Sequence, residues 1–206
     1  MKVNGKTTRS VWREPDGVSV GVIDQTLLPY QFATLRLATL EDVACAIASM
    51  QVRGAPLIGA VAAYGLCVAL RTDASDENLE RAYATLLATR PTAINLKWAL
   101  DEVTAAVRNI PRERRVEAAY ARADEISDED VAINQAIGRN GLKLIEDIVR
   151  RKKSGAPVNV LTHCNAGWLA TVDLGTATAP IYLAYDAGIK VHVYVDETRQ
   201  IGRAHV

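Results

Sequence analysis

The sequence lacks an excess of charge of either sign. Lysine and arginine together number 24, aspartate and glutamate together also number 24, and the formal net charge is zero. Proteins that bind nucleic acids usually concentrate basic side chains for that purpose, because the phosphate backbone supplies much of the binding energy. We therefore expect no nucleic-acid partner.

Cysteine is also scarce. The three cysteines, Cys45, Cys67 and Cys164, are odd in number and far apart in the chain. This pattern excludes a disulfide-stabilised framework and is typical of a reducing compartment. Cys45 and Cys67 fall on apolar faces of expected helices, so we predict that both pack in the core.

No long hydrophobic run is present. The longest apolar stretch, residues 55–70, contains Pro56, two glycines and Tyr64, and it falls short of the roughly 20 residues that a membrane span needs. The N-terminal segment, Met-Lys-Val-Asn-Gly-Lys, has no apolar run after its lysines, so we expect no signal peptide. These absences predict a soluble, cytoplasmic protein without a membrane partner.

The sequence does contain enough apolar material for a core, since 49% of its 206 residues are hydrophobic. Residues 1–38 are predicted to form strands, chiefly at 18–23 and 30–37, because β-branched and alternating patterns occur there. Apolar residues recur at helical spacing from residue 39 to 153. We expect helices at 40–51, 56–70, 76–89, 93–108, 112–125 and 127–153.

Capping residues define several of these helix limits. Thr39 precedes the first helix and can accept a hydrogen bond from its free N–H groups. Gly54 ends that helix, and Pro56 suits the first turn of the next one. Ser127, with Asp130 three residues later, is expected to cap the last helix.

The composition changes at residues 154–157, Ser-Gly-Ala-Pro, where we place a domain boundary. A strand at 158–162, a helix at 175–187 and a second strand at 189–195 are predicted beyond it. Strand, helix and strand with short links form a βαβ unit, which implies a parallel sheet.

The predicted fold class is therefore α/β. An N-terminal small-strand plus helical domain, residues 1–153, is followed by the first βαβ unit of a Rossmann-like parallel-sheet domain, residues 154–200. An open doubly wound sheet usually has about five or six strands. We therefore expect this second domain to be incomplete.

Cys164 immediately follows the first of the two strands, and Asp196 and Glu197 follow the second. Ligands of parallel sheets bind beyond the carboxyl ends of the strands, so we expect these side chains at one rim. A thiol near the N–H groups of a helix can have a lowered pKa and take part in catalysis. Most free cysteines are instead small buried hydrophobic residues. The residues alone leave both roles of Cys164 open.

Three other kinds of site are disfavoured. His163, Cys164 and His192 could be metal ligands, but no Cys-x-x-Cys or His-x-x-x-His spacing is present, so we predict no metal. A Cys–His nucleophile supported by Asp196 is conceivable, but no short motif supports that pairing. The loop after residue 162 also lacks the G-x-G-x-x-G fingerprint of dinucleotide binding.

Two arginines precede expected helix starts. Arg53 begins the sequence Arg-Gly-Ala-Pro, and Arg90 begins Arg-Pro-Thr. The free N–H groups of a helix N-terminus favour an anion, and a guanidinium beside them can hold phosphate through two hydrogen bonds. Either arginine alone is more often a surface residue, but the two arrangements together favour phosphate binding.

Four segments carry a family resemblance. They are residues 53–59 (Arg-Gly-Ala-Pro-Leu-Ile-Gly), 90–96 (Arg-Pro-Thr-Ala-Ile-Asn-Leu), 162–167 (Thr-His-Cys-Asn-Ala-Gly) and 192–199 (His-Val-Tyr-Val-Asp-Glu-Thr-Arg). Together they resemble the S-methyl-5-thioribose-1-phosphate isomerase family, in the family's order and over about residues 18–199. The wider superfamily includes ribose-1,5-bisphosphate isomerases and the regulatory subunits of the exchange factor for translation initiation factor two. The Cys-Asn-Ala-Gly segment is similar to the isomerase branch.

This resemblance implies an aldose–ketose isomerase of methionine salvage. Such an enzyme converts 5-methylthioribose 1-phosphate into 5-methylthioribulose 1-phosphate without cofactor or metal, usually as a homodimer. Cys164 then matches an acid/base or transition-state-stabilising residue, and Arg53, Gly54, Ala55 and Arg90 match positions that hold the phosphorylated sugar. A ribose-1,5-bisphosphate isomerase and a non-catalytic regulatory subunit are the alternatives, and a thiol at Cys164 disfavours the second.

The C-terminal end departs from the family. Family members follow Asp-Glu-Thr-Arg with Pro-Arg-x-Gln-Gly, whereas here Gln200 is followed by Ile-Gly-Arg-Ala-His-Val. That ending is the translation of the start of a widely used sequencing adapter, so we expect residues 201–206 to be a non-native tail. The family's catalytic aspartate and a substrate-binding lysine lie further downstream. We therefore expect this chain to be a fragment that is inactive alone.

Overall fold

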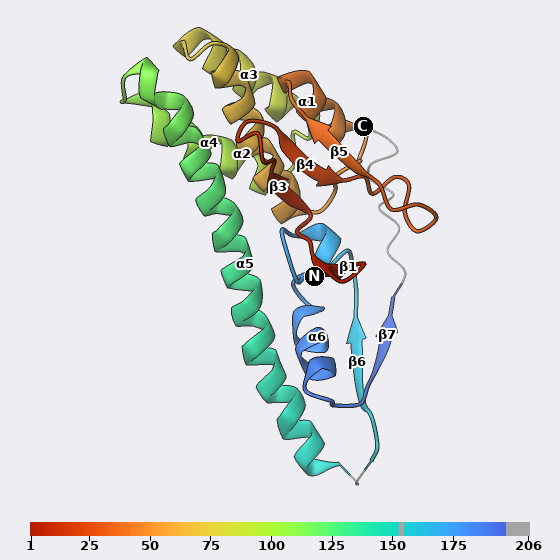
Figure 1. Cartoon of the computed structure of the whole chain (residues 1–206). Coiled ribbons are helices and arrows are strands. Elements are labelled where there is room, and N and C mark those ends of the chain that lie inside the picture. Colours follow the sequence, from red (N-terminus) through yellow and green to blue (C-terminus); the bar gives the residue numbers. More distant parts are fainter. Residues whose placement is uncertain (153–154, 197–206) are drawn as a thin grey trace.

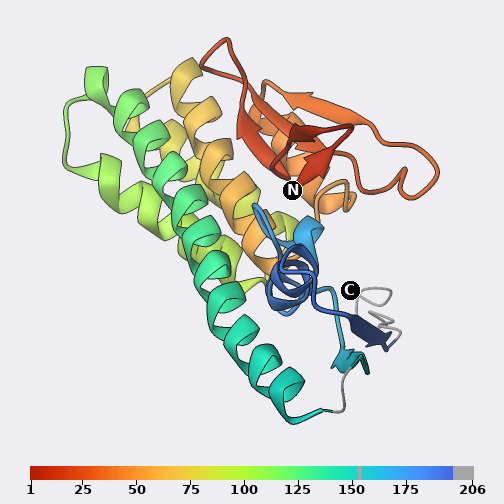
Figure 2. The same ribbon diagram turned by 60° about the horizontal axis from the view of Figure 1, so that its bottom comes forward.

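The computed structural model describes residues 1–152 and 155–196. Three small strand groups and a set of helices are arranged along one very long helix (Figures 1 and 2). The N-terminal strands and four helices lie beside one half of that helix, and the C-terminal strands and a shorter helix lie beside the other half. Residues 197–206, which include Glu197 and the expected non-native tail at 201–206, lie outside the described part of the chain.

The N-terminal strands form two small antiparallel groups. β1 (Lys2–Val3) pairs with β2 (Lys6–Thr7), and β4 (Val20–Ile23) lies between β3 (Val11–Arg13) and β5 (Thr34–Leu37). Every residue of β4 is buried, because β3 and β5 cover its edges and helices cover the sheet. The strands predicted at 18–23 and 30–37 are present as β4 and β5, each shorter than predicted.

Helix α2 (Ala55–Thr72) is the centre of the main core. It is surrounded by α1 (Leu40–Ala48), α3 (Asp76–Thr89) and α4 (Ile94–Arg108), as well as by the long helix. All its residues from Leu57 to Leu70 are buried, as its all-round apolar character requires. By length and composition α2 could also span a membrane, but 78% of it is buried inside the protein, which is typical of a core helix.

The predicted N-terminal boundary of α1 is confirmed. Thr39 accepts a hydrogen bond from the Asp42 N–H, and the Asp42 carboxylate accepts one from the Thr39 N–H. The expectation for the cysteines is confirmed for Cys67, which is buried, and wrong for Cys45, which is exposed. Cys45 lies on the side of α1 that faces away from α2, because Val43, Ala46 and Ile47 supply the buried face.

The long helix, α5 (Arg112–Arg151), is a single helix of 40 residues. The prediction of two helices with a new start at Ser127 is wrong. Ser127 is buried inside the helix, where its hydroxyl donates to the Ala123 carbonyl at 3.0 Å instead of capping a new N-terminus. Tertiary packing overrides the local capping signal here, because α5 contacts α2 and α4 on one half and α6 on the other.

The C-terminal region is a parallel βαβ unit, as predicted. β6 (Val158–Thr162) pairs in parallel with β7 (Val191–Val195), and α6 (Ala179–Asp186) connects them. A short 3₁₀ helix, η1 (Trp168–Ala170), precedes α6. Helix α6 is shorter than the predicted 175–187, because Gly175 adopts a φ of +79° and the chain turns there. The structure confirms the α/β fold class.

Helix α6 lies between α5 and the two parallel strands (Figures 1 and 2). Gly141 permits this approach, because a Cβ atom there would lie 2.4 Å from the Pro180 ring. A second, small core forms at this point from Ile145, Val158 and Ala184. Its members come from α5, β6 and α6, so the end of α5 packs with the C-terminal strands.

Candidate active site

The carboxyl ends of the two parallel strands form one rim. Thr162 pairs with Val195, and the Asp196 N–H donates to the Thr162 carbonyl at 3.1 Å. His163 and Asp196 then follow at the same edge, with 3.7 Å between the imidazole Nδ1 and the carboxylate. The predicted meeting of the two strand ends is confirmed for Asp196, whereas Glu197 lies outside the described residues.

Cys164 is exposed at this rim and has a φ of +71°. A positive φ is uncommon for a residue with a side chain and costs free energy that the surrounding fold must offset. The exposure removes the interpretation of Cys164 as a buried hydrophobic residue. The thiol is therefore accessible for chemistry at the edge where parallel sheets place their ligands.

The segment after Cys164 is anchored to the N-terminal region. The Gln25 side-chain amide donates to the Leu169 carbonyl at 2.7 Å, and the Ser10 N–H donates to the Val172 carbonyl at 2.9 Å. The Val172 N–H donates in turn to the Asp130 carboxylate at 2.7 Å. Residues from three distant parts of the chain thus hold this segment in place.

Asp130 illustrates what the sequence did not reveal. It was expected to accompany Ser127 at a helix start, but it lies within α5 and anchors the segment that carries Cys164. Burial raises the pKa of the Asp130 carboxyl, and the hydrogen bond from the Val172 N–H partly opposes that shift. No local pattern identifies this role, since Val172 is far away in sequence.

Gly54 brings the start of α2 against the same segment. Its φ is +107°, and a Cβ atom at this position would lie 2.4 Å from the Ala170 Cα and 2.5 Å from the Ala170 carbonyl oxygen. Only glycine fits such a close approach between two backbones. Arg53 and Ala55, both exposed, consequently lie beside the segment that follows Cys164.

The N-terminus of α2 has no side-chain cap. The first N–H groups of a helix have no partner within the helix and carry the positive end of its dipole. Pro56 lacks an N–H, so Ala55 and Leu57 supply the free donors of this turn. The arrangement is suited to a bound anion.

The loop of Arg90 lies near the same end of α2. Arg90 follows α3, and the Ala93 N–H donates to its carbonyl at 3.0 Å just before α4 begins. The first turn of α4 contacts α2, because a Cβ atom on Gly59 would lie 2.9 Å from the Asn95 carbonyl oxygen. The two predicted arginine motifs therefore both adjoin the first turns of α2.

Some of the predicted site segments contain buried polar atoms without hydrogen-bond partners. Five such side-chain atoms occur in the part of the chain that the structure describes. Three of them lie in or beside the predicted site segments, namely Arg90 Nη1, Thr162 Oγ1 and Trp168 Nε1. Buried polar groups are normally paired, so each of these three atoms marks a position where a polar ligand or water can supply the missing partner.

A cavity of about 480 Å³ lies elsewhere, between α3 and α4. It is lined by none of the predicted site residues. Among residues 1–152 and 155–196 no group of three histidine, cysteine or acidic side chains is placed to hold a metal ion. The expectation of a cofactor-free and metal-free site stays a prediction.

A sequence model of the initiation factor 2 subunit family matches residues 51–203 of the chain. The chain belongs to this family. It is 58% identical over 199 residues to a methylthioribose-1-phosphate isomerase of Methylocella silvestris and 59% identical over 200 residues to that of Gluconobacter oxydans. Each match covers 97% of this chain and 54% of the relative, so the chain spans about half the length of the curated relatives it matches.

Two crystal structures of this family share the fold. A 5-methylthioribose 1-phosphate isomerase from Pyrococcus horikoshii has a TM-score of 0.80 and 38% sequence identity, covering 94% of this chain and 54% of that one. The delta subunit of translation initiation factor eIF-2B from A. fulgidus has a TM-score of 0.79 and 33% identity, covering 97% and 57%. Isomerases and a translation factor subunit therefore share the fold of this chain.

Proposed function

We propose that this chain supplies the N-terminal part of an enzyme that isomerises 5-methylthioribose 1-phosphate to 5-methylthioribulose 1-phosphate in methionine salvage. The relatives named as methylthioribose-1-phosphate isomerases support this proposal, at 58–59% identity over nearly the whole chain. Two observations carry it furthest: Arg90 Nη1 is buried without a hydrogen-bond partner, and the start of α2 has no side-chain cap. A phosphate group supplies the acceptor oxygens that both features lack.

In this proposal Arg53, Gly54, Ala55 and Arg90 hold the phosphorylated sugar. Gly54 keeps the backbone of α2 close to the segment after Cys164, and the two arginines supply charge-assisted hydrogen bonds. The N–H groups at the start of α2 add the positive end of a helix dipole. Substrate phosphate and thiol would then share one site without any cofactor or metal.

Cys164 is the proposed acid/base or transition-state-stabilising residue. Phosphate on the anomeric oxygen leaves no free aldehyde, so the sugar ring must open before a proton can pass from C2 to C1. Such a transfer needs a group that accepts the C2 proton and a group that delivers a proton to C1. The exposed thiol at the strand rim supplies one partner, and the second is expected in the part of the relatives that this chain does not span.

The domain division, cellular location and oligomeric state that we propose are those expected from the family resemblance. The chain divides into an N-terminal domain, residues 1–153, and the start of a catalytic domain, residues 154–200. The complete enzyme acts in the cytoplasm as a homodimer on a small sugar phosphate, without a nucleic-acid or membrane partner. A ribose-1,5-bisphosphate isomerase remains the alternative substrate assignment, and it requires a second phosphate site.

A regulatory, non-catalytic role is the second candidate function. The likeness to the eIF-2B delta subunit favours it, since that protein has nearly the same TM-score as the isomerase. A regulatory subunit has no need of an accessible thiol at the strand rim. Loss of function on removing the Cys164 thiol therefore separates the two candidates.

The test joins residues 1–200 to the C-terminal part of the Methylocella silvestris relative and assays this chimera for conversion of each sugar phosphate. The proposal expects turnover of 5-methylthioribose 1-phosphate, a kcat lowered far more than KM by Cys164→Ser, and weaker substrate binding for Arg90→Ala. One charge-assisted contact is worth about 1.5–3 kcal/mol, which is roughly a tenfold to hundredfold change in affinity.

Two matched variants act as controls. Cys45→Ser removes another exposed thiol, and Arg139→Ala removes an exposed arginine of α5, and both should leave the kinetics unchanged. Near-normal turnover in Cys164→Ser would remove the thiol from the mechanism. Preferred turnover of ribose 1,5-bisphosphate would replace the substrate.

A further inference from the structure

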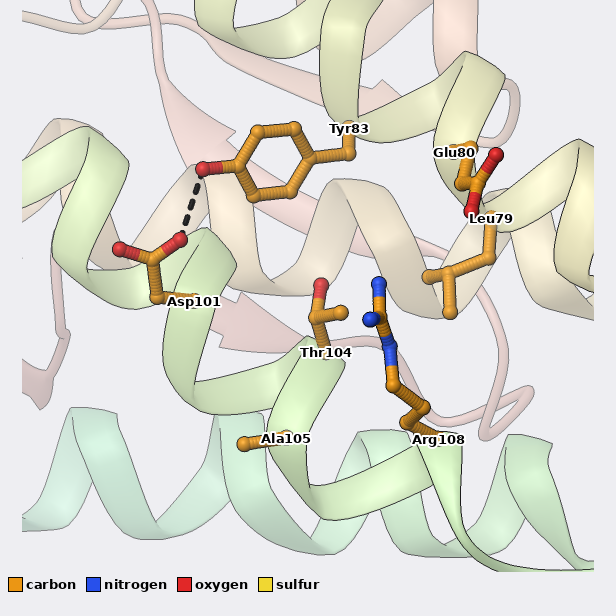
Figure 3. Close-up of a pocket in the computed structure, with 7 residues that line it drawn as sticks. All are labelled: Leu79, Glu80, Tyr83, Asp101, Thr104, Ala105 and Arg108. Atoms are coloured by element: carbon orange, nitrogen blue, oxygen red, sulfur yellow. Dashed lines mark hydrogen bonds between the residues drawn. The ribbon is translucent and has the colours of Figure 1, made fainter.

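The cavity between α3 and α4 has a lining that suggests a second binding site (Figure 3). Its volume of about 480 Å³ lies within the range of small-molecule sites. Helix α3 contributes three of the lining residues and α4 contributes four. They are Leu79, Glu80, Tyr83, Asp101, Thr104, Ala105 and Arg108.

The helical period explains why these residues meet. Leu79 and Tyr83 are four residues apart on α3, and Asp101, Thr104 and Arg108 follow one face of α4 at spacings of three and four. Figure 3 shows the Thr104 hydroxyl and the Arg108 guanidinium both extending from α4 toward α3. The cavity thus has polar groups on a wall that also includes Leu79 and Ala105.

One part of this wall is already paired. The Tyr83 hydroxyl donates to Asp101 Oδ1 at 2.7 Å, and the Lys97 ammonium donates to Asp101 Oδ2 at 2.6 Å. The Asp101 carboxylate raises the pKa of Tyr83, so the phenol stays neutral, and the Asp101 charge is balanced by Lys97. This group fixes the orientation of the Tyr83 ring and leaves no net charge at that end.

The other polar groups have no partner. Among the described residues, the side chains of Glu80 and Arg108 make no hydrogen bond or ion pair, either with each other or with a third group. The Thr104 hydroxyl is buried and likewise unpaired. A negative charge, a positive charge and a buried hydroxyl therefore border one cavity without satisfying one another.

We propose that this cavity binds the zwitterion of an apolar α-amino acid. The ligand carboxylate pairs with the Arg108 guanidinium and accepts a hydrogen bond from the Thr104 hydroxyl, which has no partner within the protein. The ligand ammonium pairs with the Glu80 carboxylate. Its apolar side chain packs against Leu79 and the Tyr83 ring. A simple anion such as inorganic phosphate fits less well, because Glu80 would repel it.

The proposal is tested on the unmodified chain with three probes that differ by one charge. L-Leucine carries both charges, L-leucinamide lacks the carboxylate, and 4-methylpentanoate lacks the ammonium. Isothermal titration and the shift in melting temperature are measured up to about 10 mM ligand, since a ligand stabilises the folded state in proportion to ln(1 + [L]/Kd). We expect saturable binding of L-leucine and at least about tenfold weaker binding of the other two.

Variants of the lining residues sharpen this test. Arg108→Gln and Glu80→Gln should each weaken L-leucine binding about tenfold or more, and Thr104→Val should weaken it about fivefold. Arg139→Gln on α5 is the matched control and should change nothing. Because Glu80 and Arg108 are exposed, circular dichroism should show the wild-type fold for both variants.

Three results would overturn the proposal. They are no saturable binding of L-leucine, equal binding of 4-methylpentanoate, and wild-type affinity in both Arg108→Gln and Glu80→Gln. The isomerase proposal does not depend on this site, since it rests on residues around the start of α2. Failure of one proposal therefore leaves the other standing.

Discussion

The two cores of this protein differ in how completely they enclose their strands. Every residue of β4 is buried, between two neighbouring strands and under helices. The parallel strands β6 and β7 have only each other among the described residues, and Leu161 and Val195 are each 69% exposed. The second core consists of three buried residues, whereas the first extends over the N-terminal strands and five helices.

This difference shows where the stability of the chain comes from. Burial of apolar surface is the dominant favourable contribution to folding, and the main core around α2 contains most of it. The parallel strands depend instead on α5 and α6, and on the hydrogen bonds that anchor the segment after β6. The region that carries Cys164 is thus attached to a stable unit rather than stable by itself.

The largest expected effect comes from a cavity in the main core. Leu66 is fully buried in α2, so Leu66→Ala should lower the free energy of unfolding by about 2–5 kcal/mol. Leu161→Ala is the matched control at an exposed position of β6 and should change it by less than about 0.5 kcal/mol. Urea or thermal unfolding measures both, and equal losses would contradict the contrast between the two cores.

The junction between the two regions gives the next effect. Gly54→Ala places a Cβ atom against the Ala170 backbone at a positive φ, so we expect a loss of about 1–3 kcal/mol and weaker hydrogen-exchange protection at residues 166–172. Gly188→Ala, at a φ of +73°, meets no atom within 4 Å and measures the cost of a positive φ without a close contact. Identical behaviour of the two variants would rule out the close contact.

A smaller, pH-dependent effect is expected at Asp130. Because its pKa is raised in the folded state, the unfolded chain loses this proton first as the pH rises, and stability falls from a carboxyl's usual pKa of about 4 up to the raised value. Asp130→Asn keeps an acceptor for the Val172 N–H and should remove this part of the slope. Denaturant midpoints measured across that range test the sign, and an unchanged slope would contradict it.

The smallest effect is expected at the strand rim. The His163 imidazole and Asp196 carboxylate are 3.7 Å apart with side chains 66% and 57% exposed, and exposed pairs contribute little. Asp196→Ala should therefore change the free energy of unfolding by less than about 0.5 kcal/mol at any pH. A larger loss would reveal a stronger pair than this geometry implies.

Elements with strong local signals were predictable from the sequence. The limits of α3 and β6 agree with the predicted 76–89 and 158–162, and Thr39 caps α1 as expected. The signal at Ser127 was equally local, but the structure contradicts it, because α5 continues through Ser127 and packs against other helices on both halves. Capping residues thus mark a helix start only where tertiary contacts do not favour continuing the helix.

The candidate site was predictable as a set of motifs but not as an arrangement. The sequence identified Arg53, Arg90 and Cys164 and predicted that the ends of the two strands meet. It gave no indication that Asp130 and Gln25 anchor the segment after Cys164, or that a cavity lies between α3 and α4. These features join residues that are far apart in the chain, and no periodicity or capping rule connects such residues.

The sequence by itself determined the family, the α/β class, the central apolar helix and the motif residues, because each depends on residue type at short, regular spacing. Only the tertiary structure decided that Gly54 contacts Ala170, that Arg90 Nη1 is buried without a partner, and that Ser127 lies inside a continuous helix. The physical reason is that close packing and desolvation are properties of the folded neighbourhood of a residue. Local propensity cannot specify that neighbourhood, because it is assembled from distant segments.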